Sequence, residues 1–180
     1  MLIDESTGFR LSQMSAIAFY LGETLGLLPE SAEGRAMTIK IVNDANDVID
    51  DITNDGGREM WTDKTWKAYI PRLERWMEIF EVSARHGGPH ARQGLFVRPY
   101  RSRHRRYRHG HATLWWTLSD RFPPIGDRLH GQAPLIAGLV KRLSATRPFQ
   151  DLIAFSDKRF GRTYCGGQIE ASMRKVIDGE

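Results

Sequence analysis

The sequence lacks the features that mark secreted, membrane and disulfide-stabilised proteins. Its 180 residues include one cysteine, Cys165, which excludes a disulfide framework and a cysteine-rich zinc site. No apolar run approaches the roughly 18 residues of a membrane span. Asp4 and Glu5 stand where a signal peptide needs basic residues, so we do not expect export. We therefore expect a soluble, cytoplasmic protein without a membrane partner.

Acidic residues are missing between Glu81 and Asp120. The same stretch contains eight arginines: Arg85, Arg92, Arg98, Arg101, Arg103, Arg105, Arg106 and Arg108. Because the whole chain has a net charge of +4, the remainder is acidic, and any nucleic-acid binding must rest on this stretch alone. The composition, with 41% apolar and 27% charged residues, is that of a globular protein large enough to bury a core.

Apolar residues recur at helical spacing through most of the chain, which predicts a mostly α-helical domain. Residues 1–11 alternate weakly around a turn and suit a short strand or hairpin. We expect N-caps at Ser12 and Ser31, and a helix over Asp63–Phe80 that is kinked or begins late at Pro71. The helix after Ser31 has an expected core stripe of Ile39, Val42, Ala45, Ile49 and Ile52. Further helices are expected near residues 112–118, 134–143, 148–155 and 169–177.

Three carboxylates share one face of the second expected helix. Asp44, Asp47 and Asp51 follow one another at i, i+3 and i+7. Neighbouring carboxylates can act as acids and bases in catalysis. The alternative, which we favour, is a solvated face paired with Lys40.

Other chemically active residue types have structural interpretations that we favour. Four tryptophans could line an apolar substrate pocket: Trp61, Trp66, Trp115 and Trp116. For any one of them, we favour a place in the core. The histidines near the arginines have no acidic co-ligand, so we expect no metal site. Cys165 is interpreted as a structural thiol rather than a nucleophile.

Several short motifs follow one another in a recognisable order. Leu11–Ile17 contains Gln-Met-Ser-Ala-Ile and is followed by Tyr20-Leu21-Gly22. Further along are Asn43–Val48, Arg72–Trp76, Ala112–Trp116 and Tyr164–Gln168. Together they resemble the cytosolic glutathione S-transferase family of bacterial type. In that family a Gln/Glu-Ser-x-Ala-Ile motif opens a helix at the end of the thioredoxin-like domain.

The resemblance implies a C-terminal helical domain over residues 31–180 and a remnant of the thioredoxin-like α/β domain, strand plus helix, over residues 1–28. It implies that glutathione is a co-substrate, which the protein conjugates to small electrophiles. It also implies that the protein forms homodimers. Trp61 and Trp116 are the candidates for the electrophile pocket. The half-domain that carries the family's catalytic Tyr, Ser or Cys would precede Met1, so we expect impaired activity in this chain.

The resemblance also implies a position for glutathione. In the family, the residue that matches Gln13 contacts the γ-glutamyl end, and the next residue contributes from a helix N-terminus. Met14 replaces the usual serine there, so only its backbone remains. An acid on the following helix often reaches the glutathione amine of the partner subunit, which indicates Asp44 or Asp47. The alternative, which we favour, is that Ser12 and Gln13 only cap a helix.

The arginine-rich segment 98–108 interleaves arginine with tyrosine, a pattern typical of a phosphate-binding arm. It stands where the family begins an apolar central helix. His104–His109 can be encoded by codons that, in a shifted reading frame, encode Gly-Ile-Ala-Asp-Ile-Val. That peptide resembles the start of the family's central helix. We therefore favour a local double frameshift between residues 87 and 110, with 85–110 irregular, and do not expect nucleic-acid binding. A non-catalytic helical interaction module is the other alternative.

Overall fold

A computed structural model describes residues 1–86, 110–161 and 167–178. Strands β1 (Leu2–Ile3) and β2 (Arg10–Leu11) pair antiparallel, with Leu2 opposite Leu11. The described helices are α1 (Met14–Thr24), α2 (Ala32–Ile52), α3 (Asn54–Gly57), α4 (Asp63–His86), α6 (Gly110–Arg121), α7 (Pro123–Gln132), α8 (Pro134–Ser144), α9 (Arg147–Phe160) and α10 (Gly167–Ile177). The prediction of a mostly helical fold with a small strand-bearing N-terminal part is confirmed.

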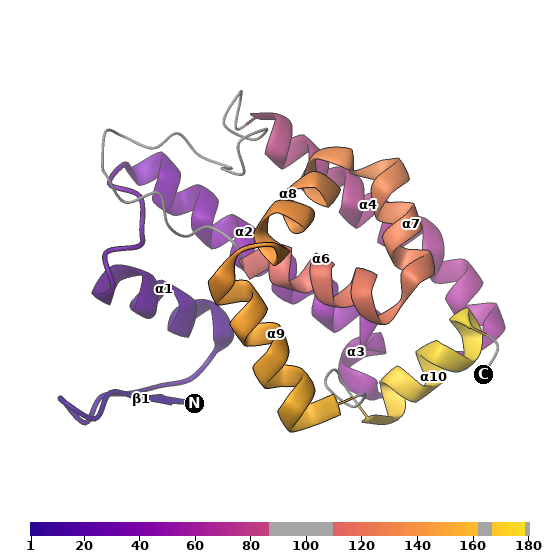
Figure 1. Ribbon diagram of the computed structural model, residues 1–180, viewed down its shortest axis with the longest axis horizontal. Helices are drawn as coiled ribbons and strands as arrows, with labels where there is room; N and C mark the ends of the chain where they lie inside the picture. Colours follow the sequence, from indigo (N-terminus) through magenta and orange to yellow (C-terminus); the bar gives the residue numbers. More distant parts are fainter. Residues whose placement is uncertain (87–109, 162–166, 179–180) are drawn as a thin grey trace.

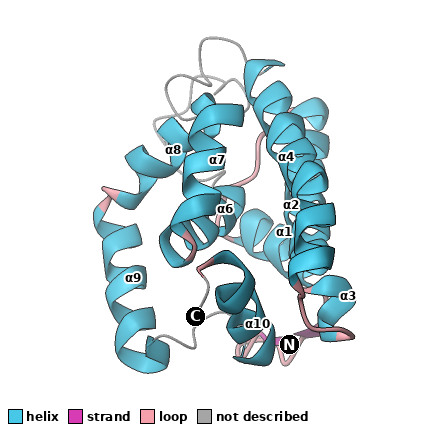
Figure 2. Cartoon of the chain, turned by 90° about the vertical axis from the view of Figure 1, so that its right-hand side faces the viewer, coloured by secondary structure: helices cyan, strands magenta, loops and turns pink. Residues whose placement is uncertain are grey.

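The helices form two layers around one core (Figures 1 and 2). Helices α2 and α4 make one layer, α6, α7 and α8 make the other, and α10 lies at one end. Both layers contribute fully buried side chains, among them Trp115, Phe80, Phe122, Leu73 and Met77. Within the described residues, no helix is both long and apolar enough to cross a membrane.

Helix α4 follows its predicted apolar pattern closely. Trp66, Leu73 and Phe80 are buried. The helix begins at Asp63 and continues through Pro71, so the later start is wrong, whereas a kink at Pro71 stays a prediction. It also continues to His86, beyond the expected beginning of the irregular segment at residue 85. Residues 87–109, where we place the frameshift, lie outside the described part of the chain.

The two predicted N-caps have different outcomes. Ser31 caps α2, because its hydroxyl accepts the N–H of Gly34 at 3.1 Å. Ser12 does not cap α1: the helix begins at Met14, and Gln13 occupies the N-cap position without a side-chain hydrogen bond. Gln13 has φ 72°, so the backbone turns sharply at that residue, and Ser12 lies one position too early.

The core side of α2 differs from the predicted stripe. Ile39 and Ile49 are 42% and 36% exposed, so their assignment to the core is wrong. The buried face consists of Ile41, Ala45, Val48 and Ile52. Periodicity shows that an apolar face exists, but the helices that pack on it decide which residues it includes.

Helix α7 is not predicted from the sequence. Its first residues are Pro123 and Pro124, which we interpret from the sequence only as the end of the preceding helix. Proline also suits the first turn of a helix, where its missing N–H is not needed. Ile125 and Leu129 then lie in the core, only 1% and 2% exposed.

Candidate functional site

The N-terminal hairpin is tied to α1 through one carboxylate. The Tyr20 hydroxyl donates to Asp4 Oδ2 at 2.7 Å, and the Ser6 hydroxyl and backbone N–H donate to Asp4 Oδ1. These hydrogen bonds stabilise the ionised carboxylate and lower the pKa of Asp4 to about 2, and the bond from the Ser6 hydroxyl has the largest effect. The Phe9 ring lies 5.2 Å from the Tyr20 ring. The hairpin thus holds a defined position beside the first helix.

Helices α1 and α2 lie antiparallel (Figure 1). The Ser15 hydroxyl donates to Asn43 Oδ1 at 2.5 Å, and Arg35 forms an ion pair with Glu23 at 2.6 Å. Glu23 stands eight positions after Ser15, and Asn43 stands eight positions after Arg35. Equal spacing at both contacts fixes the register, so the N-terminus of α1 lies level with the stretch of α2 that follows Asn43.

Among the described residues, no side chain caps the backbone N–H groups of the first turn of α1. The N-cap residue Gln13 makes no side-chain hydrogen bond, and no acidic residue occupies the first turn. Gln13 is exposed, with φ 72° and ψ 123°, and Met14 is 43% exposed. Because free N–H groups and the helix dipole both favour negative charge, this end of α1 suits a carboxylate.

The acids of α2 have different surroundings. Asp44 forms an ion pair with Lys40 and its side chain is only 17% exposed, whereas Asp47 is exposed. Asp51 accepts from Arg72 Nε at 2.5 Å and from the Trp76 indole at 2.6 Å, which joins α2 to α4. The expected pairing of Asp44 with Lys40 is therefore confirmed, but the expected solvated face is wrong for two of the three acids, because the Asp44 and Asp51 side chains are only 17% and 20% exposed.

Asp47 is the first exposed acid after Asn43 on α2. It follows Asn43 by one helical turn and lies on the same side of α2. In the antiparallel register, that position is level with the residues just before Met14. The start of α1 and the exposed Asp47 carboxylate thus belong to neighbouring, antiparallel helices.

Trp61 and Trp116 pack against other aromatic side chains. Trp61 is 7% exposed, donates its indole N–H to the Ile52 carbonyl at 2.9 Å, and lies 4.9 Å from the Tyr69 ring. Burial raises the pKa of Tyr69. Trp116 is half-buried, with its ring 5.4 Å from that of Phe149. Neither tryptophan lines the pocket described next, so their role in electrophile binding stays a prediction.

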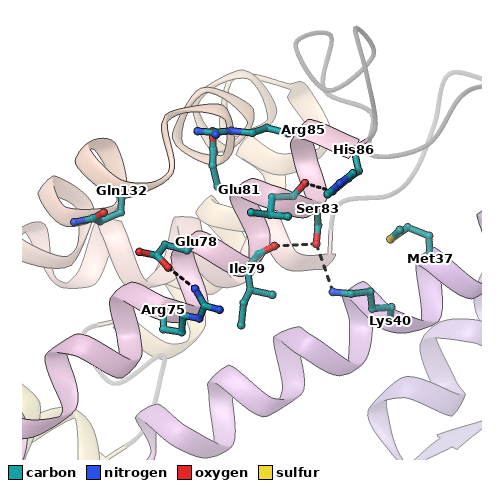
Figure 3. Close-up of a pocket in the computed structure, with 11 residues that line it drawn as sticks. Met37, Lys40, Arg75, Glu78, Ile79, Glu81, Ser83, Arg85, His86 and Gln132 are labelled. Atoms are coloured by element: carbon teal, nitrogen blue, oxygen red, sulfur yellow. Dashed lines mark hydrogen bonds and ion pairs between the residues drawn. The ribbon is translucent and has the colours of Figure 1, made fainter.

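A pocket of about 470 Å³ lies between the first half of α2 and the second half of α4 (Figure 3). Its lining residues are Met37, Lys40, Arg75, Glu78, Ile79, Glu81, Val82, Ser83, Arg85, His86 and Gln132. Lys40 points from α2 toward Ser83 of α4, and Nζ lies 3.4 Å from the Ser83 hydroxyl. The sequence pattern does not indicate this pocket, because its walls come from helices that are distant in sequence. No local pattern specifies how those helices pack against one another.

Glu81 lines the pocket but directs a carboxylate oxygen toward the start of α8. The backbone N–H groups of Leu135 and Ile136 donate to Glu81 Oε2 at 3.0 and 3.3 Å. Arg85 Nε lies 3.5 Å from Oε1. The Glu81 side chain is buried and caps a helix distant in sequence. Glu81 stands on the same face of α4 as the buried residues Met77 and Phe80. An acid on an otherwise apolar helix face is the sequence signal for such a buried, hydrogen-bonded carboxylate.

Several sequence-derived candidates lie outside the described residues. These are Cys165, the arginine-rich segment 98–108 and the histidines between residues 87 and 109. Within the described part of the chain, no group of three or more His, Cys, Asp or Glu residues is arranged to hold a metal ion.

Comparison with protein families gives one match. The family described as "Glutathione S-transferase, C-terminal domain" matches residues 37–176, which extend from within α2 to within α10. No curated protein matches the chain in sequence. The matched region contains the pocket and the acids of α2, whereas Gln13 and Met14 precede it.

Proposed function

Because the chain belongs to the glutathione S-transferase family through its C-terminal domain, we propose that it binds glutathione and contributes to its conjugation to small electrophiles. Glutathione has, at its γ-glutamyl end, a carboxylate and an ammonium group on the same carbon. The uncapped N-terminus of α1 suits the carboxylate, and an exposed acid of α2 suits the ammonium. The hydrogen bond between Ser15 and Asn43, which aligns the two helices, is the observation that carries this proposal.

Asp47 and Asp44 have unequal roles in the proposed site. Asp44 already neutralises Lys40, so a second cation gains little from it. Asp47 is exposed and lies on the same side of α2 as Asn43, so it receives the ammonium group. The resemblance assigns such an acid to the partner subunit's glutathione, whereas the register of α1 and α2 supports a contact within one chain.

Gln13 and Met14 complete the binding end. We propose that the backbone N–H groups at the start of α1 hold the carboxylate while the Gln13 side chain contacts the γ-glutamyl group. A positive φ on a residue other than glycine costs energy, and such strain is concentrated at binding sites. Met14 contributes only its backbone, which favours weaker binding than a serine hydroxyl would give.

Conjugation requires a donor that stabilises the glutathione thiolate, which then attacks the electrophile. Among the described residues we assign none to this donor, and we expect conjugation by this chain alone to be slow. The proposal places the protein in the cytoplasm, where reduced glutathione forms the main thiol pool. Family membership also supports a homodimer, which light scattering of the purified protein tests.

Calorimetric titration with reduced glutathione tests the proposed site. Asp47→Asn is expected to weaken binding about tenfold, because it removes one charge-assisted contact. Asp127→Asn changes an exposed acid of α7 in the same way and is expected to alter the affinity less than twofold. Equal affinities for the two variants, or no binding at millimolar glutathione, would contradict the proposal.

A further inference from the structure

Helix α9 lies at the edge of the molecule, on the side away from α2 and α4 (Figure 2). It packs against α8, and its inner side meets the core at two buried residues, Phe149 and Ser156. The Phe149 ring lies 5.4 Å from that of Trp116 in α6. The outer side of this 14-residue helix is exposed to solvent along its whole length.

The outer side of α9 carries a seam with the spacing of paired helices. Pro148, Leu152, Phe155 and Arg159 follow one another at intervals of four, three and four residues. These are the intervals at which contact positions recur where two helices pack along their length. Leu152 is 43% exposed and Phe155 is 58% exposed. Because the two large side chains are adjacent and open to water, their burial favours a contact with another helix.

The charges beside this seam are complementary to those of a second α9. Asp151 and Lys158, seven residues apart and both exposed, lie on the same flank of the seam. If two copies of α9 pack antiparallel with Leu152 opposite Phe155, Asp151 of each copy lies beside Lys158 of the other. A parallel pair would instead place Arg159 against Arg159. The pair that Asp151 makes with Arg147 in its own chain is exposed on both sides, 60% and 86%, so it is weak.

We propose that α9 is a contact surface for a second copy of this chain, in which the two α9 helices pack antiparallel. Leu152 and Phe155 interlock across the twofold axis, and two ion pairs between Asp151 and Lys158 flank them. A 14-residue helix is about 21 Å long, so the contact is smaller than the interfaces of about 1,600 Å² that hold stable complexes. The association is therefore weak and depends on concentration. It is separate from the homodimer that the family implies, in which an acid of α2 reaches the partner subunit.

Sedimentation velocity of the full chain over a series of protein concentrations tests the proposal. Asp151→Lys places two lysines beside each other at both ends of the contact, and Lys158→Asp places two aspartates there. Each change is expected to weaken the association at least fivefold. The double variant exchanges the two charges and should restore the association to within twofold of the unmodified protein. Because the exchange does not restore the pair with Arg147, an effect on the single chain would not produce this recovery.

Phe155→Ser tests the apolar part of the seam. The side chain is already 58% exposed, so the fold is expected to be retained, which far-UV circular dichroism checks. The variant should associate at least tenfold more weakly, and any association that it keeps belongs to another surface. Asp127→Lys, the same change of charge at an exposed position of α7, is the matched control and should leave the association unchanged. Equal association of the unmodified protein and Phe155→Ser would overturn the proposal, as would a double charge exchange that associates as weakly as the single variants.

Discussion

Replacing Glu81 by alanine tests how the second layer of helices is held on α4. In the native protein the carboxylate accepts the N–H groups of Leu135 and Ile136 at 3.0 and 3.3 Å, at the first turn of α8. Alanine leaves both donors without an acceptor, and Ile136 is fully buried. At about 1–2 kcal/mol for each unsatisfied group, the expected loss is about 3 kcal/mol of the free energy of unfolding.

Two further variants separate the contributions to that loss. Glu81→Gln keeps a carbonyl oxygen in place and removes only the charge beside the helix N-terminus, so about 1 kcal/mol is expected. Glu78→Ala, three residues earlier on α4, removes an acid that is 47% exposed and paired with Arg75. Its expected effect is about 0.5 kcal/mol or less.

Urea denaturation followed by tryptophan fluorescence measures these differences, and thermal unfolding provides a second reading. For a chain of this size, about 3 kcal/mol corresponds to a decrease in Tm of about 6–12 °C. If Glu81→Ala destabilises the protein no more than Glu78→Ala, the carboxylate does not cap α8 and this reasoning is wrong.

Two more predictions concern the hairpin and the core. Ser6→Ala is expected to raise the pKa of Asp4 from about 2 toward 3.8, and Tyr20→Phe to raise it less, as measured by NMR titration of the carboxyl group; the reverse order would contradict the assigned contacts. Because the folded-state pKa is lowered, the Asp4 contribution to stability is complete above about pH 4 and is lost as the pH falls toward 2. Leu73→Ala, at a position 0% exposed, is expected to cost about 2–5 kcal/mol in urea denaturation, whereas Leu152→Ala, at a position 43% exposed, should cost about 1 kcal/mol or less. Equal losses for the two leucine variants would show that the burial pattern is wrong.

The helical fold could be predicted because its signals are local. The apolar spacing of α4 and the serine cap of α2 each depend on residues within a few turns of one another. Signals with two meanings led to errors: the prolines at 123 and 124 suit either the end of one helix or the start of the next. The exposure of Ile39 depends on which helices cover α2, and periodicity carries no information about that.

The candidate sites depend on contacts between distant residues and were only partly predictable. Gln13 and the acids of α2 are indicated by resemblance, whereas the proximity that we propose for them rests on the register that Ser15 and Asn43 set. The preference for Asp47 over Asp44 follows from the ion pair with Lys40, which the sequence spacing does indicate. The pocket between α2 and α4 requires α2 to pack beside the second half of α4, and no local pattern specifies that arrangement.

The most direct test of the glutathione site is a pair of calorimetric titrations of the unmodified protein. One uses reduced glutathione, and the other uses the analogue that lacks only the γ-glutamyl amine. We predict that both bind through the carboxylate at the N-terminus of α1, with the analogue about tenfold weaker because it has no ammonium group for Asp47. Equal affinities for the two compounds, or no binding of either, would contradict the proposed site.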